Sequence, residues 1–513
     1  MSGAAVSGAT VSRLSRRGGV GDRSMRLSEL LQSAGVQPRR SSGDAEVVHV
    51  ADDSRRCRPG ACFLAVRGAA ADGHDYIPAA VEAGAASVVC EDPTAVPDGV
   101  AFAVVEDARR AAGPIAQAAL GWPARQLAAV GVTGTNGKTT VAHLIREILH
   151  AAGHRPALLG TIAYETGGQA RPAPTTTPGP VALAAMTAEM VAAGKTHLVM
   201  EVSSHALDQR RTGGVAFAAG VFTNLSGDHL DYHGTLDAYL AAKARLFADL
   251  PPEASAVVNR DDPHWAAIAG AGPARRLLYG FDPAADVRGR IERADAGGTA
   301  FELTAPTGQA AVRTALIGRH NVSNCLAAAA ACVALGVDLG TIAATLSAVG
   351  PVRGRLEAVP ADAPFATFVD YAHTDDALAN VLDALAAVEH RRLLVIFGCG
   401  GDRDRTKRPR MARVAAARAD RIFVTSDNPR TEDPDAIVAE IVAGFANGDR
   451  QRVTVEPDRR AAIGLAVREA EPGDVVLIAG KGHETYQILG DRRVDFDDAE
   501  VAAAAIRSRE GAA

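Results

Sequence analysis

The sequence lacks any apolar run near the roughly 18 residues that a helix needs to cross a bilayer. It also lacks a strong excess of charge of one sign, since its formal net charge is −6 and 22% of its residues are charged. This balance gives no reason to expect nucleic acid or an anionic membrane as a partner. With 47% hydrophobic residues the composition is that of a soluble globular protein, and local basic loops could still bind an acidic small molecule.

Cysteine is scarce and shows no metal-binding pattern. The six cysteines are scattered, and no two have the CxxC spacing of a zinc site. This favours reduced, buried thiols, and we expect a cytoplasmic protein. Residues 1–24 are rich in Ser, Gly and Arg without a secretory apolar core. Their composition favours a disordered tail, with an organelle transit peptide as the alternative.

The chain is too long for a single core, so three domains are the natural expectation. From Met25 to about Asp107, helix-like and strand-like stretches alternate, and a helix over 107–120 follows. The run at 126–134 is apolar, which is typical of a buried parallel strand. Strands and helices alternate from there to about residue 350, with no repeat or low-complexity linker.

A last block begins after Pro351, with strands predicted at 393–397, 422–425 and 475–478 between helical patterns. This order predicts a mostly parallel sheet. The expected fold class is α/β with three domains: a central P-loop-type parallel sheet, flanked by a small N-terminal α/β domain and a Rossmann-like C-terminal domain. The tail and the three domains are expected at residues 1–24, 25–108, 109–350 and 351–513.

Residues 131–140, Gly-Val-Thr-Gly-Thr-Asn-Gly-Lys-Thr-Thr, join the predicted strand to a helix with one apolar face. Gly134 and Gly137 permit a turn that points backbone N–H groups at phosphate oxygens. Lys138 can reach the β- and γ-phosphates, and the Thr139 hydroxyl can bind Mg²⁺. The strict GxxxxGK[ST] pattern fails at one position, because Val132 stands where its first glycine belongs. A glycine turn that binds no nucleotide is therefore the alternative. The strand–loop–helix context favours nucleotide binding.

The segment Thr-Gly-Thr-Asn-Gly-Lys-Thr-Thr at 133–140 resembles the nucleotide loop of the Mur ligases and of their folylpolyglutamate synthase relatives. The resemblance continues from Met25 to the C-terminus, with motifs in all three predicted domains. It implies ATP as a substrate. The residues that it assigns to ATP are Gly134, Thr135, Asn136, Gly137, Lys138, Thr139, Thr140, Asn321, Asn324, Asp370 and His373.

Two acidic or histidine-rich positions follow buried strands beside this loop. Glu201 ends a predicted strand, where a Mg²⁺ ligand is expected and an ordinary strand-end carboxylate is the alternative. The segment 223–234 follows another apolar strand and concentrates Asn, Asp and His. In the Mur ligases the histidine of the matching Asp-His pair ligates a second Mg²⁺, and the resemblance gives this role to His229.

Lys243 lies in a predicted helix, at the centre of an apolar stripe formed by Leu236, Leu240 and Phe247. A lysine snorkelling from a half-buried face is the alternative. A buried lysine loses its charge readily, and a neutral amine can react with CO₂. The family carries a carbamylated lysine in this Lys-x-x-Leu-Phe setting, where it helps to hold the second Mg²⁺. The resemblance thus implies catalytic roles for Lys138, Glu201, His229 and Lys243, and two Mg²⁺ held by Thr139, Glu201, His229 and carbamylated Lys243.

Several loops resemble those with which Mur ligases bind their UDP-N-acetylmuramoyl-dipeptide substrate. The proline-bounded loop at 174–178 and the segments 52–60 and 67–77 carry this likeness, and without it each would be an ordinary loop. Arg211 suits the carboxylates of such a substrate, because guanidinium binds them in bidentate fashion. The residues implied are Ser54, Ala69, Ala70, Ala71, Thr176, Thr177, Ser203, Gln209 and Arg211.

Three loops in the last block, at 398–404, 426–430 and 479–484, follow predicted strands and should gather at the carboxyl edge of a parallel sheet. Each could be a structural turn. Asp-Asn-Pro-Arg at the second loop resembles the Mur ligases that add meso-diaminopimelate, whose distal carboxylate and ammonium suit Arg430 and Glu484. Lysine would leave a buried arginine without its carboxylate, at a cost in discrimination of about 10⁴. The residues implied are Arg403, Asp427, Asn428, Pro429, Arg430, Gly480 and Glu484.

The resemblance therefore implies an ATP-dependent ligase that adds meso-2,6-diaminopimelate to UDP-N-acetylmuramoyl-L-alanyl-D-glutamate through an acyl phosphate, forming ADP and phosphate, in peptidoglycan precursor synthesis. A lysine-adding Mur ligase is the first alternative; a folate polyglutamate ligase and a P-loop switch or motor are more remote. The expected partners are the two small-molecule substrates, without nucleic acid or membrane, and the expected state is a monomer. Asp375 departs from the family pattern, in which proline is usual, so the shape of its loop is open.

Overall fold

The structure is a computed structural model that describes residues 24–68, 71–295 and 297–510. The predicted tail at 1–24 lies outside the described residues except for Ser24. The chain forms two compact units: the first comprises Met1–Gln126, Pro178–Val191 and Gln209–Val215, and the second Leu127–Thr177, Ala192–Asp208 and Ala216–Ala513. Among the described helices, none has both the length and the apolar character that crossing a membrane requires.

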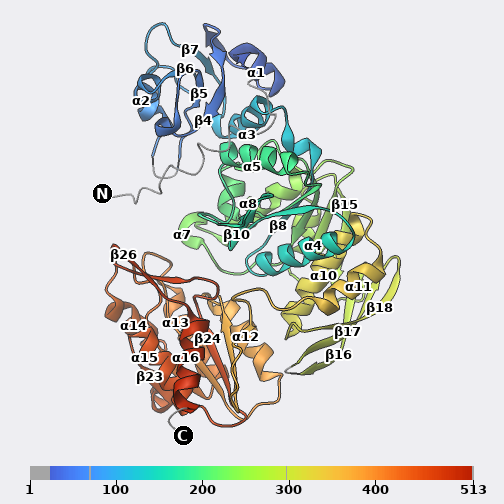
Figure 1. Ribbon diagram of the computed structural model, residues 1–513, viewed down its shortest axis with the longest axis vertical. Helices are drawn as coiled ribbons and strands as arrows, with labels where there is room; N and C mark the ends of the chain where they lie inside the picture. The colour runs from blue at the N-terminus through green and yellow to red at the C-terminus, as the bar shows by residue number, and fades with distance from the viewer. Residues whose placement is uncertain (1–23, 69–70, 296, 511–513) are drawn as a thin grey trace. The chain divides into compact units, whose positions relative to one another are not determined.

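The first unit is built on a five-stranded sheet in the order β2-β7-β6-β5-β4, with only β2 antiparallel to its neighbour. Helices α1 and α3 share one apolar core that includes Leu27, Leu30 and Ile115 (blue and blue-green in Figure 1). This confirms the predicted α/β character of the region. The elements are β1 (Met25–Arg26), α1 (Leu27–Ser33), β2 (Arg40–Ser42), β3 (Glu46–Val47), β4 (His49–Ala51), β5 (Ala61–Leu64), α2 (Ile77–Glu82), β6 (Ala85–Cys90), β7 (Ala101–Val104), α3 (Ala108–Ala119) and α5 (Pro180–Ala192).

The second unit contains an eleven-stranded sheet in the order β11-β10-β9-β12-β8-β13-β14-β15-β16-β17-β18. The strand predicted at 126–134 is β8, and it lies between two parallel neighbours, β12 and β13. The strands are β8 (Ala128–Thr133), β9 (Pro156–Leu159), β10 (Ala163–Glu165), β11 (Arg171–Pro172), β12 (His197–Glu201), β13 (Phe217–Phe222), β14 (Ser255–Asn259), β15 (Arg275–Gly280), β16 (Val287–Asp295), β17 (Gly298–Ala305) and β18 (Gly308–Thr314).

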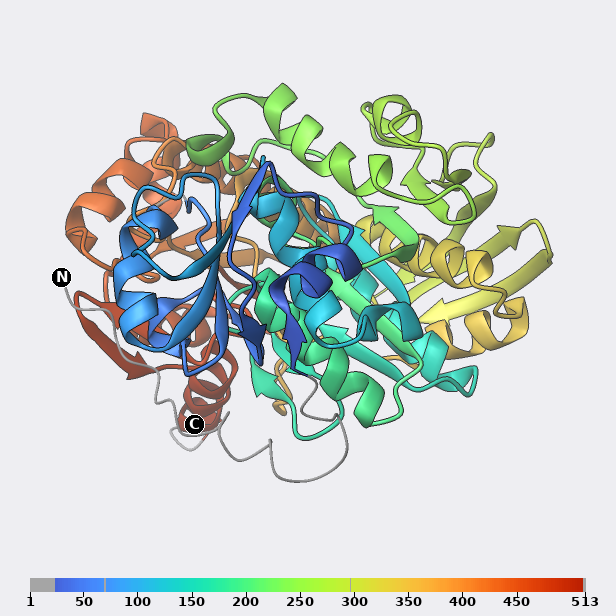
Figure 2. The same cartoon turned by 90° about the horizontal axis from the view of Figure 1, so that it is seen from above.

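The expectation that strands and helices alternate as far as residue 350 is wrong over 287–314. Strands β16, β17 and β18 follow one another there as an antiparallel extension of the sheet (yellow ribbons in Figure 2). In β17, buried and partly exposed residues alternate, as they do when an antiparallel sheet has one face on a core and the other toward water.

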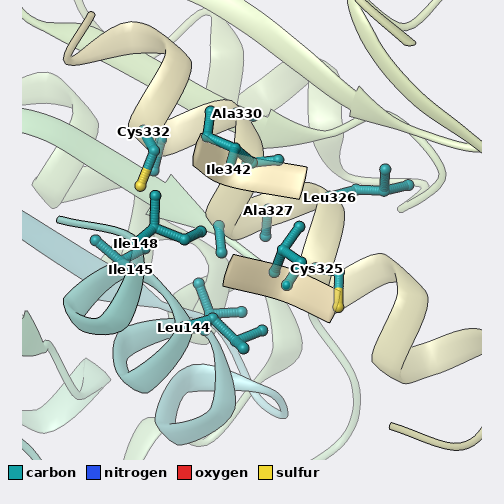
Figure 3. Packing of buried hydrophobic residues seen from close by; sticks show 14 of the residues in the cluster. Leu144, Ile145, Ile148, Cys325, Leu326, Ala327, Ala330, Cys332 and Ile342 are labelled. Carbon is teal, nitrogen blue, oxygen red and sulfur yellow. The ribbon is translucent and has the colours of Figure 1, made fainter. Parts of the chain in front are cut away.

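Helices α4 (Lys138–Ala151), α10 (Arg319–Ala334) and α11 (Leu339–Ala348) pack together in the core of this sheet. In Figure 3, Leu144, Ile145 and Ile148 of α4 face Cys325 and its neighbours on α10. Each of these four side chains is at most 1% exposed, which confirms the apolar face predicted after the phosphate loop. The other helices of this region are α6 (Ser204–Asp208), α7 (Leu230–His233), α8 (Leu236–Ala248) and α9 (Trp265–Ala269).

The C-terminal part of the second unit has a six-stranded sheet in the order β19-β20-β24-β21-β22-β23, in which only β19 runs antiparallel to its neighbour. The three predicted strands correspond to β21, β22 and β24, whereas β20 and β23 were not predicted. The elements are β19 (Glu357–Ala358), β20 (Ala366–Asp370), α12 (Asp375–Ala386), β21 (Leu393–Phe397), α13 (Lys407–Arg418), β22 (Arg421–Val424), α14 (Pro434–Val442), β23 (Val453–Val455), α15 (Arg459–Glu469), β24 (Val475–Ala479), β25 (Tyr486–Leu489), β26 (Arg492–Asp495) and α16 (Asp498–Glu510).

Candidate active site

The phosphate loop lies between the end of β8 and the start of α4, and two of its positions admit only glycine. Gly134 has φ +151°, and a Cβ there would lie 1.8 Å from Thr223 Oγ1. Gly137 has φ +84°, and its Cβ would lie 2.4 Å from Asn324 Oδ1. The loop therefore follows a path that other residues cannot take, close against the neighbouring strand end and α10.

A cavity of about 470 Å³ surrounds this loop. It is lined by the ends of parallel strands, by the start of α10 and by residues 355 and 370–381. Parallel strands present their carboxyl ends at one edge, which is where ligands bind in such sheets. The predicted residues that it brings together are Gly134, Thr135, Asn136, Gly137, Lys138, Thr139, Thr140, Thr176, Glu201, Ser203, His229, Lys243, Asn321, Asn324, Asp370 and His373.

Glu201 is the last residue of β12 and is 1% exposed. Its carboxylate accepts hydrogen bonds from the hydroxyl of Thr139 at 3.0 Å and from the backbone and hydroxyl of Thr161 at 2.8 and 3.1 Å. A buried carboxylate beside a threonine hydroxyl is a set of hard oxygen ligands, and these are the ligands that Mg²⁺ prefers.

His229 directly precedes the short helix α7 with φ +55°, and its Nε2 lies 3.5 Å from a carboxylate oxygen of Asp228. Burial lowers the pKa of His229 to about 4, and the charges of Lys138 and Lys243 act in the same direction. Neutral imidazole is the form that ligates metals. In the described ranges, no group of three or more His, Cys, Asp and Glu is placed to hold an ion by itself. Any Mg²⁺ here would need water and phosphate oxygens to complete its coordination.

Lys243 is 1% exposed, which confirms its predicted burial. Its Nζ lies 4.1 Å from the ring centroid of Tyr239 and has no hydrogen bond to any described residue. Burial, with the nearby charge of Lys138, holds the pKa of Lys243 well below its usual value. The predicted stripe is wrong at Leu236, which is 37% exposed because it is the first residue of α8. The buried face consists of Tyr239, Ala242, Lys243, Leu246 and Phe247.

The residues assigned to ATP beyond the phosphate loop are each held by hydrogen bonds. Asp370 is buried and accepts 2.7 Å hydrogen bonds from the backbone of Leu356 and Ala372, and burial raises its pKa. His373 has Nδ1 2.8 Å from the carbonyl of Tyr371, and burial lowers its pKa to about 4. On α10, Asn324 donates to Asn321 at 3.1 Å, and Asn321 to the carbonyl of Ile317 at 2.9 Å.

On the substrate side, Thr177 ties its loop to the end of β12. Its hydroxyl donates to the carbonyl of Glu201 at 2.9 Å and accepts from the backbone of Ser203 at 3.0 Å. Thr176 lies on the cavity wall, 3.1 Å from Thr161 between hydroxyl oxygens. The remaining residues of this set, Ser54, Ala71, Gln209 and Arg211, belong to the first unit, whereas Ala69 and Ala70 lie outside the described residues.

The three C-terminal loops gather at one edge of their sheet, as predicted. Asn428 donates to Glu484 at 2.8 Å, and the ammonium of Lys481 lies 3.2 Å from Glu484, 3.1 Å from Asn428 and 3.5 Å from Asp427. Lys481 is fully buried. The cluster therefore contains two carboxylates that share one internal cation.

Arg430 joins this cluster to the loop at 398–404. It has φ +54°, and its guanidinium donates to the carbonyl of Gly401 at 2.8 Å. Arg403 is exposed and donates to the carbonyl of Asp402 at 2.9 Å. None of the seven predicted amino-acid-binding residues lines the cavity at the phosphate loop. A contact links the two regions, since the rings of Tyr371, on the cavity wall, and His483, beside Glu484, lie 4.9 Å apart.

Family models and solved relatives match nearly all of this chain. The Mur ligase family catalytic domain matches residues 46–123, the Mur ligase middle domain 132–332, and the Mur ligase glutamate ligase domain 354–482. A UDP-N-acetylmuramoyl-L-alanyl-D-glutamate–2,6-diaminopimelate ligase from Geobacillus thermodenitrificans is 46% identical, over 91% of this chain and 96% of that protein. The chain belongs to the Mur ligase family.

Two further Mur ligases support this placement. A protein of the same name from Geobacter metallireducens is 44% identical, over 94% of this chain and 98% of its own length. A solved structure of a UDP-N-acetylmuramoyl-L-alanyl-D-glutamate–2,6-diaminopimelate ligase superposes with a TM-score of 0.66 at 35% identity, over 91% of this chain and 96% of that one. The three-domain α/β fold class predicted from the sequence is thereby confirmed.

Sequence reasoning missed two charged residues that line the cavity at the phosphate loop. Arg355 donates to the hydroxyl of Thr139 at 3.1 Å and lies 4.6 Å from the ring of Tyr371. Asp376 accepts from Asn136 at 2.8 Å and from Ser226 at 3.0 Å. The sequence signal that could have indicated them is their position. Arg355 lies at the start of the last block, and Asp376 follows the strand that ends at residue 370.

The departure from the Mur ligase pattern at Asp375 does not distort the loop. Asp375 is the first residue of α12, and Thr374 caps the helix by accepting a hydrogen bond from the backbone of Ala377. The first helical position tolerates proline, and an acid there is stabilised by the positive end of the helix. Both residue types therefore suit this position.

Proposed function

We propose that this chain is the ATP-dependent ligase that joins meso-2,6-diaminopimelate to the D-glutamate γ-carboxylate of UDP-N-acetylmuramoyl-L-alanyl-D-glutamate in peptidoglycan precursor synthesis. The observation that carries this proposal is the cavity that joins the phosphate loop to Glu201, Thr176 and Ser203. It offers one space for a triphosphate and for the end of a carboxylate substrate. Relatives that carry this activity in their names match the chain almost from end to end.

The reaction begins when the γ-phosphoryl group of ATP passes to the γ-carboxylate, which gives an acyl phosphate and ADP. Lys138 and Arg355 lie at the phosphate loop, and both are placed to balance the negative charge on the transferring group. The amine of diaminopimelate then attacks the acyl carbon and loses a proton. The tetrahedral intermediate collapses to the amide and inorganic phosphate. The protein contributes mainly position and charge.

The oxygen ligands at the cavity fit Mg²⁺. Thr139 and Glu201 would hold one ion, and His229 would help to hold a second. When bound, Mg²⁺ neutralises phosphate charge. Lys243 is proposed to complete the second site as a carbamate, because burial holds the pKa of its amine well below the usual value, and a neutral amine can add to CO₂.

We propose that the C-terminal cluster recognises the far end of diaminopimelate. Glu484 and Asp427, which lie on either side of Lys481, would bind the distal ammonium of diaminopimelate. Arg430 would bind its distal carboxylate. Lys481 already offsets one of the two carboxylates, so a zwitterionic end leaves the cluster near neutrality. Lysine brings the ammonium without the carboxylate, and it would leave Arg430 without a partner of opposite charge.

The wider assignments are proposed on the same basis. All six cysteines are free and buried, which supports a cytoplasmic location. We also propose a monomer that acts on two small-molecule substrates. The three largest of the five described sheets, with five, eleven and six strands, support domains at 25–108, 109–350 and 351–513.

The test is ADP release by the purified full chain with ATP, Mg²⁺ and the UDP-muramoyl-dipeptide, with either diaminopimelate or lysine as the amine. Release that depends on both the dipeptide and diaminopimelate, with lysine far weaker, is expected. Preference for lysine would assign the chain to the lysine-adding ligases. ADP release without either substrate would indicate an NTPase switch and refute the proposal.

A further inference from the structure

The cluster of Asp427, Asn428, Lys481 and Glu484 contains its own cation. The ammonium of Lys481 lies 3.2 Å from a carboxylate oxygen of Glu484 and 3.5 Å from one of Asp427. It also donates to the amide oxygen of Asn428 at 3.1 Å, and it lies 5.6 Å from the centre of the Tyr486 ring. Since Lys481 is 0% exposed, its charge acts inside the protein.

Hydrogen bonds through Asn428 fix this arrangement. The amide nitrogen of Asn428 donates to Glu484 at 2.8 Å. Its amide oxygen accepts from Lys481 and, at 2.9 Å, from the backbone of Ile488. Both ends of the amide therefore have partners, and they hold the carboxylate and the ammonium at set positions. We expect the ammonium to stay in place when a ligand binds.

The cluster carries one net negative charge. Burial acts to raise the pKa of Asp427, but nearby positive charges, chiefly those of Lys481 and Arg459, outweigh it and hold that pKa below its usual value. Arg459 is itself paired with Asp498 at 2.7 Å, so it adds no net charge. The two carboxylates of the cluster and the one ammonium of Lys481 leave a single negative charge.

Arg430 adds the opposite charge at the edge of the same cluster, where its guanidinium lies 3.5 Å from the carbonyl of Asn428. The charged side chains proposed to face the far end of the amino acid therefore balance one another; they are Asp427, Lys481, Glu484 and Arg430. Once a ligand covers the site, charge there is unfavourable unless it is paired. A balanced site favours a ligand end that carries both an ammonium and a carboxylate.

Lys481 sets this balance. Without its ammonium the remaining three side chains would carry one net negative charge, and they would suit a ligand end that is cationic. The distal carboxylate of diaminopimelate would then meet two carboxylates and a single guanidinium. Like charges brought together without a counter-ion reduce affinity, and proteins use such repulsion to exclude competing ligands.

We propose that Lys481 is a specificity-determining residue, whose internal ammonium makes the site suit amino acids with a zwitterionic far end better than those with a cationic one. This inference rests on the proposed function and extends it. Arg430 selects by pairing with the distal carboxylate. Lys481 selects through Asp427 and Glu484, because it leaves them enough negative charge for one ammonium and no more.

The experiment measures which amine the full chain prefers. With ATP, Mg²⁺ and the UDP-muramoyl-dipeptide saturating, kcat/KM for ADP release is determined with diaminopimelate and with lysine, and the ratio of the two values is compared among variants. Lys481→Met should lower the diaminopimelate-to-lysine ratio roughly 10- to 100-fold, the loss expected for one interaction with a charged group. Asp427→Asn shifts the charge the other way and should raise the ratio. The double variant, Lys481→Met with Asp427→Asn, restores the balance, so its ratio should return toward that of wild type even though its rates fall with both amines.

Arg392→Met is the matched control for stability. Arg392 pairs at 2.6 Å with the buried carboxylate of Asp474, directly before β24, whereas Gly480 and the cluster follow the other end of that strand. This variant should lower the Tm, as removal of one partner of a buried pair does, and leave the ratio unchanged. Lys481→Met should lower the Tm as well. If it does not fold, Asp427→Asn and the double variant provide the same comparison, because both lack the second carboxylate and differ only in Lys481.

A ratio for Lys481→Met within twofold of wild type would overturn the role of Lys481 alone, and so would equal ratios for Asp427→Asn and the double variant. The role would also fail if Arg392→Met lowered the ratio as far as Lys481→Met does, since lost stability would then explain the change. A wild-type chain that prefers lysine, or that releases no ADP with either amine, would overturn the proposed function, on which the role of Lys481 rests.

Discussion

The buried ion pair beneath the cluster of Asp427, Asn428, Lys481 and Glu484 provides a quantitative test of the proposed C-terminal site. Arg459 on α15 and Asp498 on α16 form two parallel hydrogen bonds of 2.7 Å, and neither side chain is exposed. Arg459 also donates to the carbonyl of Ala479 at 3.0 Å, directly before Gly480. Its charge lowers the pKa of Asp427. The pair thus supports two of the three loops.

Asp498→Ala leaves the fully buried guanidinium of Arg459 with two backbone carbonyls, those of Ala479 and Ser426, and no bound carboxylate. Breaking such a pair by removing one partner costs about 3–5 kcal/mol. Native-state hydrogen exchange of the full chain, followed by mass spectrometry, measures this locally. Amides of β24 should exchange roughly 100- to 5000-fold faster, since each 1.4 kcal/mol is about tenfold.

Two further variants separate burial from charge. Asp383→Ala breaks the pair of Arg418 with Asp383, also 2.7 Å but with Asp383 58% exposed, and should change exchange by less than about tenfold because exposed pairs contribute little. Arg459→Met combined with Asp498→Leu removes both charges and should recover most of the protection. A β24 exchange rate that Asp498→Ala leaves within tenfold of wild type would refute the reasoning.

Two substitutions test the assignment of the site itself. Arg430→Ala should raise the KM for diaminopimelate roughly 10- to 100-fold while the KM for ATP stays unchanged, because a carboxylate loses a charged hydrogen-bond donor; steady-state ADP release measures both, and an equal loss for the two substrates would contradict the assignment. Lys243→Ala should lose at least roughly 10- to 100-fold in kcat, as metal-site substitutions do, and formate or acetate should partly restore it. If added formate or acetate did not change the kcat of Lys243→Ala, this result would count against carbamylation.

The phosphate loop and the C-terminal strands were predictable because their signals are local. A buried strand, two glycines, a lysine and an apolar helix face stand within the 24 residues from 128 to 151, and they correspond to β8, the loop and α4. Three apolar runs likewise became β21, β22 and β24. Parallel strands then fix where their loops meet without further information.

The remainder depended on contacts between distant residues. In the sequence nothing distinguishes Arg355 from the other arginines, and only the fold brings it to Thr139. In the same way, only the fold brings Lys481 to Glu484 and Asp427. Leu236 matched the helical period, but the first turn of α8 lies beyond the core, so periodicity alone misplaced it. Strands β16–β18 lacked the helices expected between them because their sheet extension is antiparallel.

The arrangement of charge explains why one site can serve both halves of the reaction. The guanidinium of Arg355 contacts Thr139 at the phosphate loop and the ring of Tyr371, and that ring packs on His483, next to Glu484. These contacts place the groups proposed to hold the phosphoryl donor and those proposed to hold the amine on opposite sides of a few shared side chains. Proximity of this kind favours attack on a short-lived acyl phosphate, because the amine is held before the intermediate can meet water.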